Sequence, residues 1–243
     1  MEPRVRTADE AFVRNPGQAV CRDRVLVRER SRPPFDQGTE NSAMTCSTPT
    51  EKQQLRREKL QARKSLTPEY RRTADMSIRN RLEALEEYRS ASVVAAYASD
   101  GTEPDLIPLL RRAREEGKTI CFPRWREKDS TYEMAVADSA FTLVEGKWKM
   151  PEPPRDAPAV PDPMLEQALW LIPGVAFDER CERLDRGKGI YDRFLARTRG
   201  TAAGIFYDCQ KTAALPMEPH DRPLTLVVTE SALYRRGKQC TKQ

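Results

Sequence analysis

Hydrophobic and polar positions recur with two different periods along most of the chain, and this pattern predicts alternating helices and strands. Thr67-Pro68 fits the first turn of a helix, and apolar positions follow at helical spacing. Those positions are Ala74, Ile78, Leu82 and Leu85. Strands are expected at Ser92–Tyr97, Lys118–Phe122, Tyr132–Val136, Ala168–Ile172, Ala202–Tyr207 and Leu224–Thr229. Helices are expected at Leu106–Arg114 and from the Arg183–Gly189 turn through Arg199. Such alternation indicates an α/β domain with a mainly parallel sheet.

One more helix is expected before this pattern. Thr48 fits its N-cap, Pro49 its first position, and Glu51 the position that closes a capping box. Residues 1–47 show neither period and carry many charges, so they are predicted to be a disordered extension.

The domain itself is expected over residues 48–232, followed by a basic C-terminal tail over residues 233–243. Within the domain, residues 149–163 contain six prolines, which predicts an extended surface connection. No internal repeat is visible along the chain.

Composition and charge narrow the class of protein. The 243 residues are 38% hydrophobic and 33% charged, which is typical of a soluble globular protein. No apolar run approaches the roughly 20 residues needed to span a bilayer. The arginine-rich N-terminus is interspersed with acids, so a cytoplasmic location is favoured over organellar targeting. The net charge of +5 permits an anionic ligand or partner.

The cysteines and the single histidine argue against a metal framework. The six cysteines form no C-x-x-C pair, which argues against a zinc site or a disulfide scaffold and favours reduced thiols. His220 has no partner cluster in the sequence and is interpreted as a structural loop residue.

The stretch from residue 172 to residue 193 carries the strongest chemical signal. An expected strand leads into a basic loop with Gly187 and Gly189, and the loop opens a helix. Glycines let backbone N–H groups approach an anion, and a helix N-terminus adds partial positive charge. The cationic side chains of this stretch include Arg183, Arg186 and Lys188. Asp192 offers an oxygen ligand for Mg²⁺ beside bound phosphates. A glycine turn with solvated arginines is the alternative, and spacing alone leaves both open.

The string I-P-G-V-A-F-D-E-R-C-E-R-L-D-R-G-K-G-I-Y-D-R resembles the signature of the 5-formyltetrahydrofolate cyclo-ligase family. Four other segments agree with the family in the same order. Lys52 and Arg56, which share one helical face, match an ATP-contacting pair. Glu103 in G-T-E-P-D-L matches a folate-contacting glutamate, and Trp148 in K-W-K-M-P-E-P matches an aromatic residue lining the folate site. Asp221 in M-E-P-H-D-R-P-L matches an aspartate that helps hold magnesium.

The resemblance implies a three-layer α/β/α fold with a Rossmann-like, mainly parallel sheet of the NagB/RpiA/CoA-transferase type. It also implies ATP-dependent conversion of 5-formyltetrahydrofolate to 5,10-methenyltetrahydrofolate, with release of ADP and phosphate. The expected enzyme is a monomer that binds neither nucleic acid nor a membrane.

The resemblance also implies a set of site residues. Those expected to bind ATP are Lys52, Arg56, Arg183, Arg186, Gly187, Lys188 and Gly189. Mg²⁺ is expected at Asp192 and Asp221, and the folate at Glu103, Trp148 and Tyr191. The residues expected to take part in catalysis are Arg186, Lys188 and Tyr191.

Four positions depart from the family's pattern. Cys181 and Asp185 stand where the family has glycine, Ile190 where it has tyrosine, and Thr225 where it commonly has aspartate. Asp185 brings negative charge to a loop expected to bind phosphate. Like charges about 4 Å apart cost on the order of 4 kcal/mol at an effective dielectric constant of about 20. The carboxylate is therefore expected either to face the phosphates or to be held aside by the arginines that flank it.

Two other functions compete with the enzyme. A catalytically weakened relative that binds nucleotide or folate as a regulator is favoured by Asp185 and Ile190. A nucleic-acid-binding protein is supported by the net charge alone.

Overall fold

A computed structural model describes residues 50–218, 221–237 and 241–242. These residues belong to one compact unit that spans Ser47–Gln243. The predicted disordered extension over residues 1–47, the predicted helix cap at Thr48 and Pro49, and His220 lie outside the described residues.

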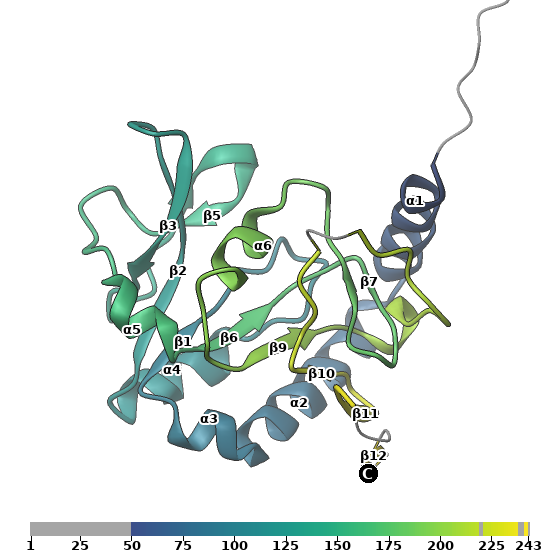
Figure 1. Ribbon diagram of the computed structural model, residues 1–243. Coiled ribbons are helices and arrows are strands. Elements are labelled where there is room, and N and C mark those ends of the chain that lie inside the picture. Colours follow the sequence, from purple (N-terminus) through teal and green to yellow (C-terminus); the bar gives the residue numbers. More distant parts are fainter. Residues whose placement is uncertain (1–49, 219–220, 238–240, 243) are drawn as a thin grey trace, which may run out of the picture. The chain divides into compact units, whose positions relative to one another are not determined.

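An eight-stranded sheet forms the middle of this unit (Figure 1). Its strands in spatial order are β12 (Thr241–Lys242), β11 (Ala232–Arg235), β10 (Leu226–Val228), β9 (Ala202–Ile205), β6 (Leu169–Ile172), β1 (Val93–Ala95), β2 (Thr119–Arg126) and β3 (Thr131–Val136). Neighbours from β10 to β2 pair in parallel, whereas β3, β11 and β12 pair antiparallel at the two edges. The predicted mainly parallel sheet is confirmed.

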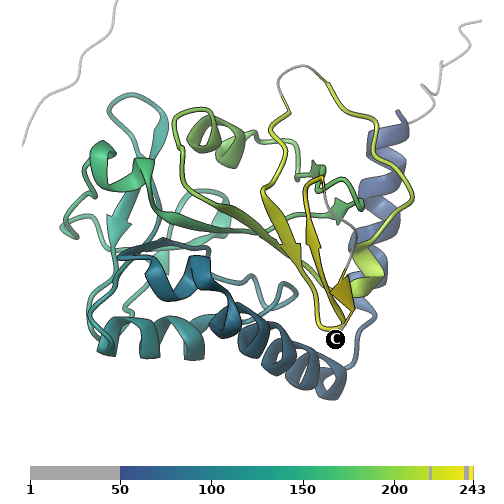
Figure 2. The same ribbon diagram turned by 60° about the horizontal axis from the view of Figure 1, so that its bottom comes forward.

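Helices cover both faces of the sheet, as Figure 2 shows. The helices of the structure are α1 (Glu51–Lys64), α2 (Pro68–Ala84), α3 (Glu86–Ser90), α4 (Ile107–Glu115), α5 (Asp162–Glu166) and α6 (Ile190–Leu195), with short 3₁₀ turns η1 (Lys147–Lys149) and η2 (Asp208–Gln210). Helix α1 packs through Leu55 against Ala176 and Leu184 of a small separate hairpin. Helices α2 to α4 pack on one face, and α5 and α6 lie on the other. The predicted three layers are therefore confirmed.

Side-chain alternation along the strands explains the two packed faces. In β6, Leu169 and Leu171 point into the layer that α2 and α4 cover, while Trp170 and Ile172 point into the opposite layer. All four side chains are buried, as expected for a parallel strand with helices on both sides.

The helix caps follow local sequence, with one correction. Helix α2 is capped by Thr67 and has Pro68 in its first turn, as predicted. Helix α1 is capped by Thr50, whose hydroxyl accepts from the N–H of Gln53, and Gln53 closes the capping box. The prediction that Glu51 closes the box was wrong, because both members of the box lie two residues further along the chain.

Two small hairpins interrupt the predicted pattern. Strand β7 (Ala176–Phe177) pairs with β8 (Arg183–Leu184), so a hairpin separates the loop at 185–189 from β6, which was expected to feed it directly. Strand β4 (Val144–Glu145) pairs with β5 (Pro151–Glu152), and β5 lies inside the region 149–163 that was predicted to be an extended connection.

Two predicted boundaries also differ from the structure. Helix α6 ends at Leu195, whereas the prediction continued it through Arg199. The tail expected from residue 233 begins inside β11, which pairs with β10 and extends the sheet.

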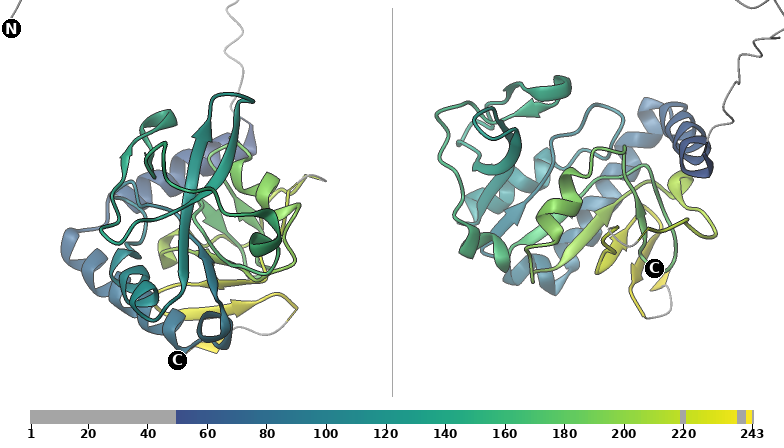
Figure 3. Two further views of the ribbon diagram at one scale, coloured as in Figure 1. Left: turned by 90° about the vertical axis from the view of Figure 1, so that its left-hand side faces the viewer. Right: turned by 45° about the horizontal axis from the view of Figure 1, so that its top comes forward.

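The hairpin of β2 and β3 follows the predicted strands and is longer than they were, and its far end projects beyond the sheet (Figure 3, left).

Candidate functional site

Two neighbouring cavities lie at the carboxyl ends of the central parallel strands. Strand β1 leads to Asp100 and Glu103, and strand β6 leads to Pro173. The strand order reverses here, because β1 pairs with β2 on one side and with β6 on the other. The crevice at such a reversal is where open α/β sheets usually bind ligands.

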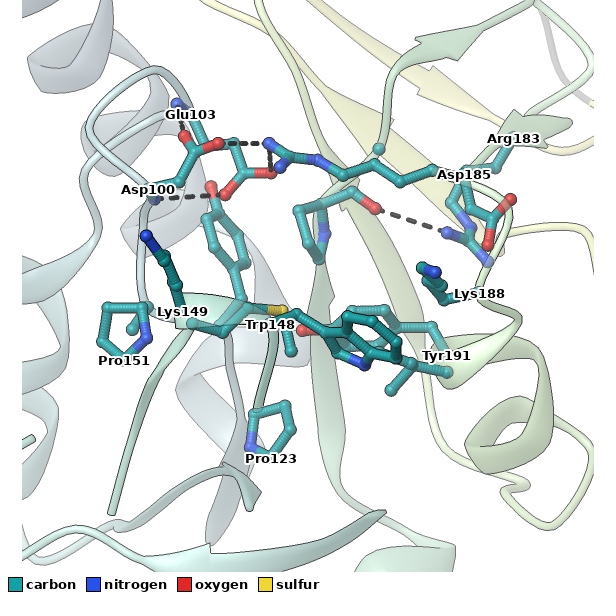
Figure 4. Close-up of a pocket in the computed structure, with 17 residues that line it drawn as sticks. Asp100, Glu103, Pro123, Trp148, Lys149, Pro151, Arg183, Asp185, Lys188 and Tyr191 are labelled. Carbon is teal, nitrogen blue, oxygen red and sulfur yellow. Dashed lines mark hydrogen bonds and ion pairs between the residues drawn. The ribbon is translucent and has the colours of Figure 1, made fainter. Parts of the chain in front are cut away.

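The first cavity, here called the α1 cavity, has a volume of about 750 Å³. It is lined by Thr50, Lys52, Gln53, Arg56, Asp185, Gly187, Lys188, Gly189, Asp192, Arg193, Ala196, Glu218, Asp221 and Arg222. The second, here called the Trp148 cavity, has a volume of about 290 Å³ and is shown in Figure 4. It is lined by Tyr97, Ala98, Asp100, Glu103, Pro123, Trp148, Lys149, Met150, Pro151, Pro173, Gly174, Arg183, Asp185, Arg186, Lys188, Ile190 and Tyr191. Asp185 and Lys188 line both cavities.

The residues expected to bind ATP divide between the two cavities. Five of them line the α1 cavity: Lys52, Arg56, Gly187, Lys188 and Gly189. Arg183 and Arg186 instead line the Trp148 cavity. Both residues expected to hold Mg²⁺, Asp192 and Asp221, line the α1 cavity. All three residues expected to bind folate, Glu103, Trp148 and Tyr191, line the Trp148 cavity.

Helix α1 supplies a cationic wall of the α1 cavity. The Nζ of Lys52 lies 2.8 Å from a carboxylate oxygen of Glu218 and 2.8 Å from one of Asp221. Burial alone would lower the pKa of Lys52, but the hydrogen bonds and charges of these two acids outweigh burial and raise it. One turn further on, the Nε of Arg56 donates to the carbonyl oxygen of Asp185 at 2.8 Å.

The loop after β8 turns sharply at two glycines. Gly187 has φ +87° and Gly189 has φ +59°, values that favour glycine. The Asp185 carboxylate accepts from the N–H of Gly187 at 2.8 Å and from the N–H of Gly189 at 3.0 Å. Burial would raise the pKa of Asp185, but these two N–H groups and the charges of Arg183 and Arg56 lower it below its usual value.

The arginines that flank Asp185 have other partners. Arg183 is buried, and its Nη2 donates to Asp192 at 2.8 Å. Arg186 points toward the Trp148 cavity, where it pairs with Asp100 and with Glu103. One of the two alternatives expected for the Asp185 carboxylate, that both flanking arginines hold it aside, therefore needs correction. The carboxylate is held by loop N–H groups and by Arg56 on α1, and Arg183 acts on it through its charge.

A charge cluster around the buried Arg63 lies beside the Trp148 cavity. Arg63, which is 1% exposed, lies 3.5 Å from a carboxylate oxygen of Glu103 and 3.6 Å from one of Asp100. It also donates to the hydroxyl of Thr102 at 2.8 Å. Burial and the negative charge of Asp100 raise the pKa of Glu103 despite the nearby Arg63 and Arg186.

Sequence reasoning missed Arg63 and Asp100. A signal for Arg63 was present, because Lys52, Arg56, Lys59 and Arg63 recur at i, i+4, i+7 and i+11 and so share one face of α1. No comparable signal for Asp100 was present in the sequence. Its carboxylate accepts from the N–H groups of Thr102 and Glu103, so in the sequence it has the pattern of an ordinary loop cap.

Trp148 lies at the mouth of the second cavity with a strained backbone. Its φ is +60°, that of the following Lys149 is +59°, and its side chain is 57% exposed. The Nζ of Lys188 sits 4.0 Å from the centroid of the indole ring (Figure 4). This cation–π contact joins the η1 turn to the glycine loop.

Comparison with known proteins assigns the chain to a family. A sequence profile described as the 5-formyltetrahydrofolate cyclo-ligase family matches residues 48–230. The chain belongs to this family. The predicted resemblance is thereby confirmed. None of the described helices combines the length and the hydrophobicity that a membrane span requires.

Relatives named 5-formyltetrahydrofolate cyclo-ligase include those of Mycolicibacterium smegmatis and Escherichia coli. The first is 32% identical over 75% of this chain and 95% of its own length, and the second is 30% identical over 72% and 97%. The solved structure of Aquifex aeolicus 5,10-methenyltetrahydrofolate synthetase has a TM-score of 0.68 at 30% identity, covering 79% of this chain and 96% of its own.

The departures from the cyclo-ligase pattern now have structural consequences. Cys181 has φ +62°, so a residue with a side chain adopts the left-handed conformation where the resemblance has glycine, at a cost of about 1 kcal/mol. Ile190 is buried against the Trp148 cavity and offers it no hydroxyl. The Thr225 hydroxyl accepts from the N–H of Ala202 at 3.1 Å, which ties β10 to β9.

Proposed function

We propose that this cyclo-ligase family member converts 5-formyltetrahydrofolate to 5,10-methenyltetrahydrofolate with consumption of ATP and release of ADP and phosphate. The observation that carries the proposal is the pair of adjoining cavities that share Lys188. The α1 cavity has five cationic side chains beside four carboxylates, a lining suited to phosphates that bind with a metal ion. The Trp148 cavity has three aromatic side chains beside acidic and basic groups, a lining suited to a pteridine. A phosphoryl group can therefore pass between the two ligands without leaving the site.

The proposed reaction activates the formyl oxygen by phosphorylation, after which the neighbouring folate nitrogen attacks the activated carbon and phosphate leaves. Lys52 and Arg56 bind the nucleotide phosphates. Lys188 supplies positive charge at the boundary between the cavities, where charge develops on the transferred group. Catalysis then consists mainly of positioning and charge neutralisation.

The Trp148 cavity positions the folate in this proposal. Trp148 and Tyr191 offer aromatic faces, and Glu103 offers an acidic hydrogen-bond acceptor. Arg186 acts from this cavity, since it pairs with Glu103 and Asp100. Its proposed role is therefore to orient the folate-binding acids, in addition to any contact with phosphate.

The first experiment measures formation of the methenyl product by its absorbance, with and without ATP. We expect product only when both 5-formyltetrahydrofolate and ATP are present. Binding of folate without any product would contradict the enzyme proposal and support the catalytically weakened relative, which the position of Asp185 favours as the second candidate.

We also propose that Mg²⁺ binds at Asp192 and Asp221 together with the nucleotide. Among the described residues, no three His, Cys, Asp or Glu side chains are grouped closely enough to hold a metal. Mg²⁺ usually needs only one or two carboxylates when substrate phosphates complete its coordination, so this donor set fits. When bound, the ion would neutralise phosphate charge.

Replacing Asp192 or Asp221 with asparagine should weaken Mg²⁺-dependent ATP binding by about tenfold, or about 1.4 kcal/mol. The reason is the loss of a charged oxygen ligand from the α1 cavity. Calorimetric titrations of ATP with and without magnesium measure the effect. Asp129→Asn is the control, because Asp129 is ion-paired to Arg126 and lines neither cavity. Equal magnesium dependence in all three variants would refute the assignment.

The same proposal includes a cytoplasmic monomer that needs no nucleic acid or membrane. The monomer is supported by the finding that residues of a single chain line both cavities. Light scattering after size exclusion, together with cell fractionation, tests these points. A stable dimer in light scattering, or recovery of the protein in an organellar fraction, would overturn them.

A further inference from the structure

Two backbone hydrogen bonds and an ion pair hold the Asp185 side chain within the glycine loop. One carboxylate oxygen accepts from the N–H of Gly187 at 2.8 Å, and the other accepts from the N–H of Gly189 at 3.0 Å. Arg56 adds an ion pair at 3.5 Å to the side chain and a hydrogen bond to the carbonyl oxygen. Both carboxylate oxygens are thus engaged by groups that line the α1 cavity.

These groups are the ones that an incoming phosphate would use. Successive N–H groups in a turn with positive φ form a concave anion-binding site, and each N–H donates one good hydrogen bond. A carboxylate and a phosphate present similar anionic oxygens to such donors. Because burial is outweighed by the loop N–H groups and two arginines, the pKa of Asp185 is lowered and the side chain stays anionic near neutral pH.

We propose that Asp185 is an internal occupant of the phosphate loop that sets the nucleotide affinity of this chain, because its carboxylate competes with a nucleotide phosphate for the N–H groups of Gly187 and Gly189. This inference rests on the proposed function insofar as a nucleotide binds in the α1 cavity. A phosphate that takes these donors must displace the carboxylate and tolerate its charge nearby.

A purely structural role is the competing interpretation. Asp178 accepts from the N–H groups of Arg180 and Glu182, the same i+2 and i+4 pattern, and it lines neither cavity. The pattern alone therefore shows only that an aspartate can hold a turn. Asp185 differs in lining both cavities and in facing Arg56, so its removal opens the donors to a ligand.

Two substitutions distinguish the occupation of the loop N–H groups by the Asp185 side chain from the effect of its negative charge. Asp185→Gly frees both N–H groups and removes the charge. Asp185→Asn removes the charge but keeps one amide oxygen that can still accept from the loop. Asp138→Gly is the matched control, because Asp138 accepts from the N–H of Thr142 in an exposed loop and lines neither cavity. It carries the same added backbone freedom as Asp185→Gly.

The test titrates each full-length variant with inorganic tripolyphosphate and with MgATP, and records its melting temperature. We expect Asp185→Gly to raise affinity for both probes about tenfold, Asp185→Asn to raise it less, and Asp138→Gly to leave it unchanged. Unchanged or weaker binding by both Asp185 variants, at an unchanged melting temperature, would overturn the inference. If Asp185→Gly is poorly folded, unchanged or weaker binding by a folded Asp185→Asn does the same.

These readouts keep the inference distinct from the proposed function. Tighter tripolyphosphate binding by the Asp185 variants, with no methenyl product from any of them, supports the inference and contradicts the enzyme proposal. Methenyl formation without any gain in affinity supports the enzyme and contradicts the inference. An absence of tripolyphosphate and MgATP binding in every variant contradicts both.

Discussion

Replacing Lys188 with methionine should lower kcat/KM for methenyl formation by about 100- to 1,000-fold. Lys188 is the cation that lines both cavities, so its charge lies where the phosphoryl group changes ligands. Methionine keeps a similar length of apolar chain and removes the ammonium. The loss should appear in kcat as well as in KM for ATP, because the charge matters most in the transition state.

Lys149→Met is the matched control for this experiment. Lys149 also lines the Trp148 cavity but not the α1 cavity, so its replacement should leave ATP binding intact. Steady-state kinetics with varied ATP and varied folate separate the two lysines. A loss of less than about tenfold in Lys188→Met would show that the shared lysine does not stabilise the transferred group.

Replacing Arg63 with methionine should destabilise the protein by about 3 kcal/mol, because the change removes a charge that compensates Glu103, whose side chain is 9% exposed. Arg63 is 1% exposed and lies within 3.6 Å of carboxylate oxygens of both Asp100 and Glu103. For a domain of this size we expect a fall in melting temperature of about 6–12 °C. Arg57→Met, on the exposed face of the same helix, should have little effect.

The effect of Arg63→Met should depend on pH in a defined direction. Burial and the charge of Asp100 already raise the pKa of Glu103, and Arg63 opposes that shift. Without Arg63 the pKa rises further, so the folded state holds this proton at a pH where the unfolded state has lost it. Stability then falls as pH rises, and the deficit should be smaller at acidic pH.

A double variant provides the corresponding check. Adding Glu103→Gln to Arg63→Met removes one buried charge and should recover part of the lost stability. Thermal melts at acidic and neutral pH measure both effects. Equal deficits at the two pH values, with no recovery in the double variant, would show that Arg63 contributes packing and not charge compensation.

Much of the fold could be predicted because hydrophobic periodicity is a local property. The strands around Val94 and Leu171 and the helix through Ile78 each bury an apolar pattern that the sequence displays directly. Strands β4, β5, β7 and β8 were missed for a physical reason, since two-residue strands are too short to show a period. Whether such short segments pair as strands depends on contacts with parts of the chain that are distant in sequence.

The sequence was enough to predict the family, the α/β order of elements and most of the charged residues that line the two cavities, but not Asp100 or the neighbouring Arg63. Loops that follow parallel strands meet at one edge of the sheet, so ordered motifs such as those of Glu103 and Lys188 come together without further information. The pairing of the charged side chains follows only from the folded structure. Arg183 pairs with Asp192, and Arg186 pairs with Asp100 and Glu103. The Asp185 carboxylate accepts from N–H groups of its own loop. Long charged side chains reach several partners of opposite sign, and only their directions and burial in the folded chain select among them.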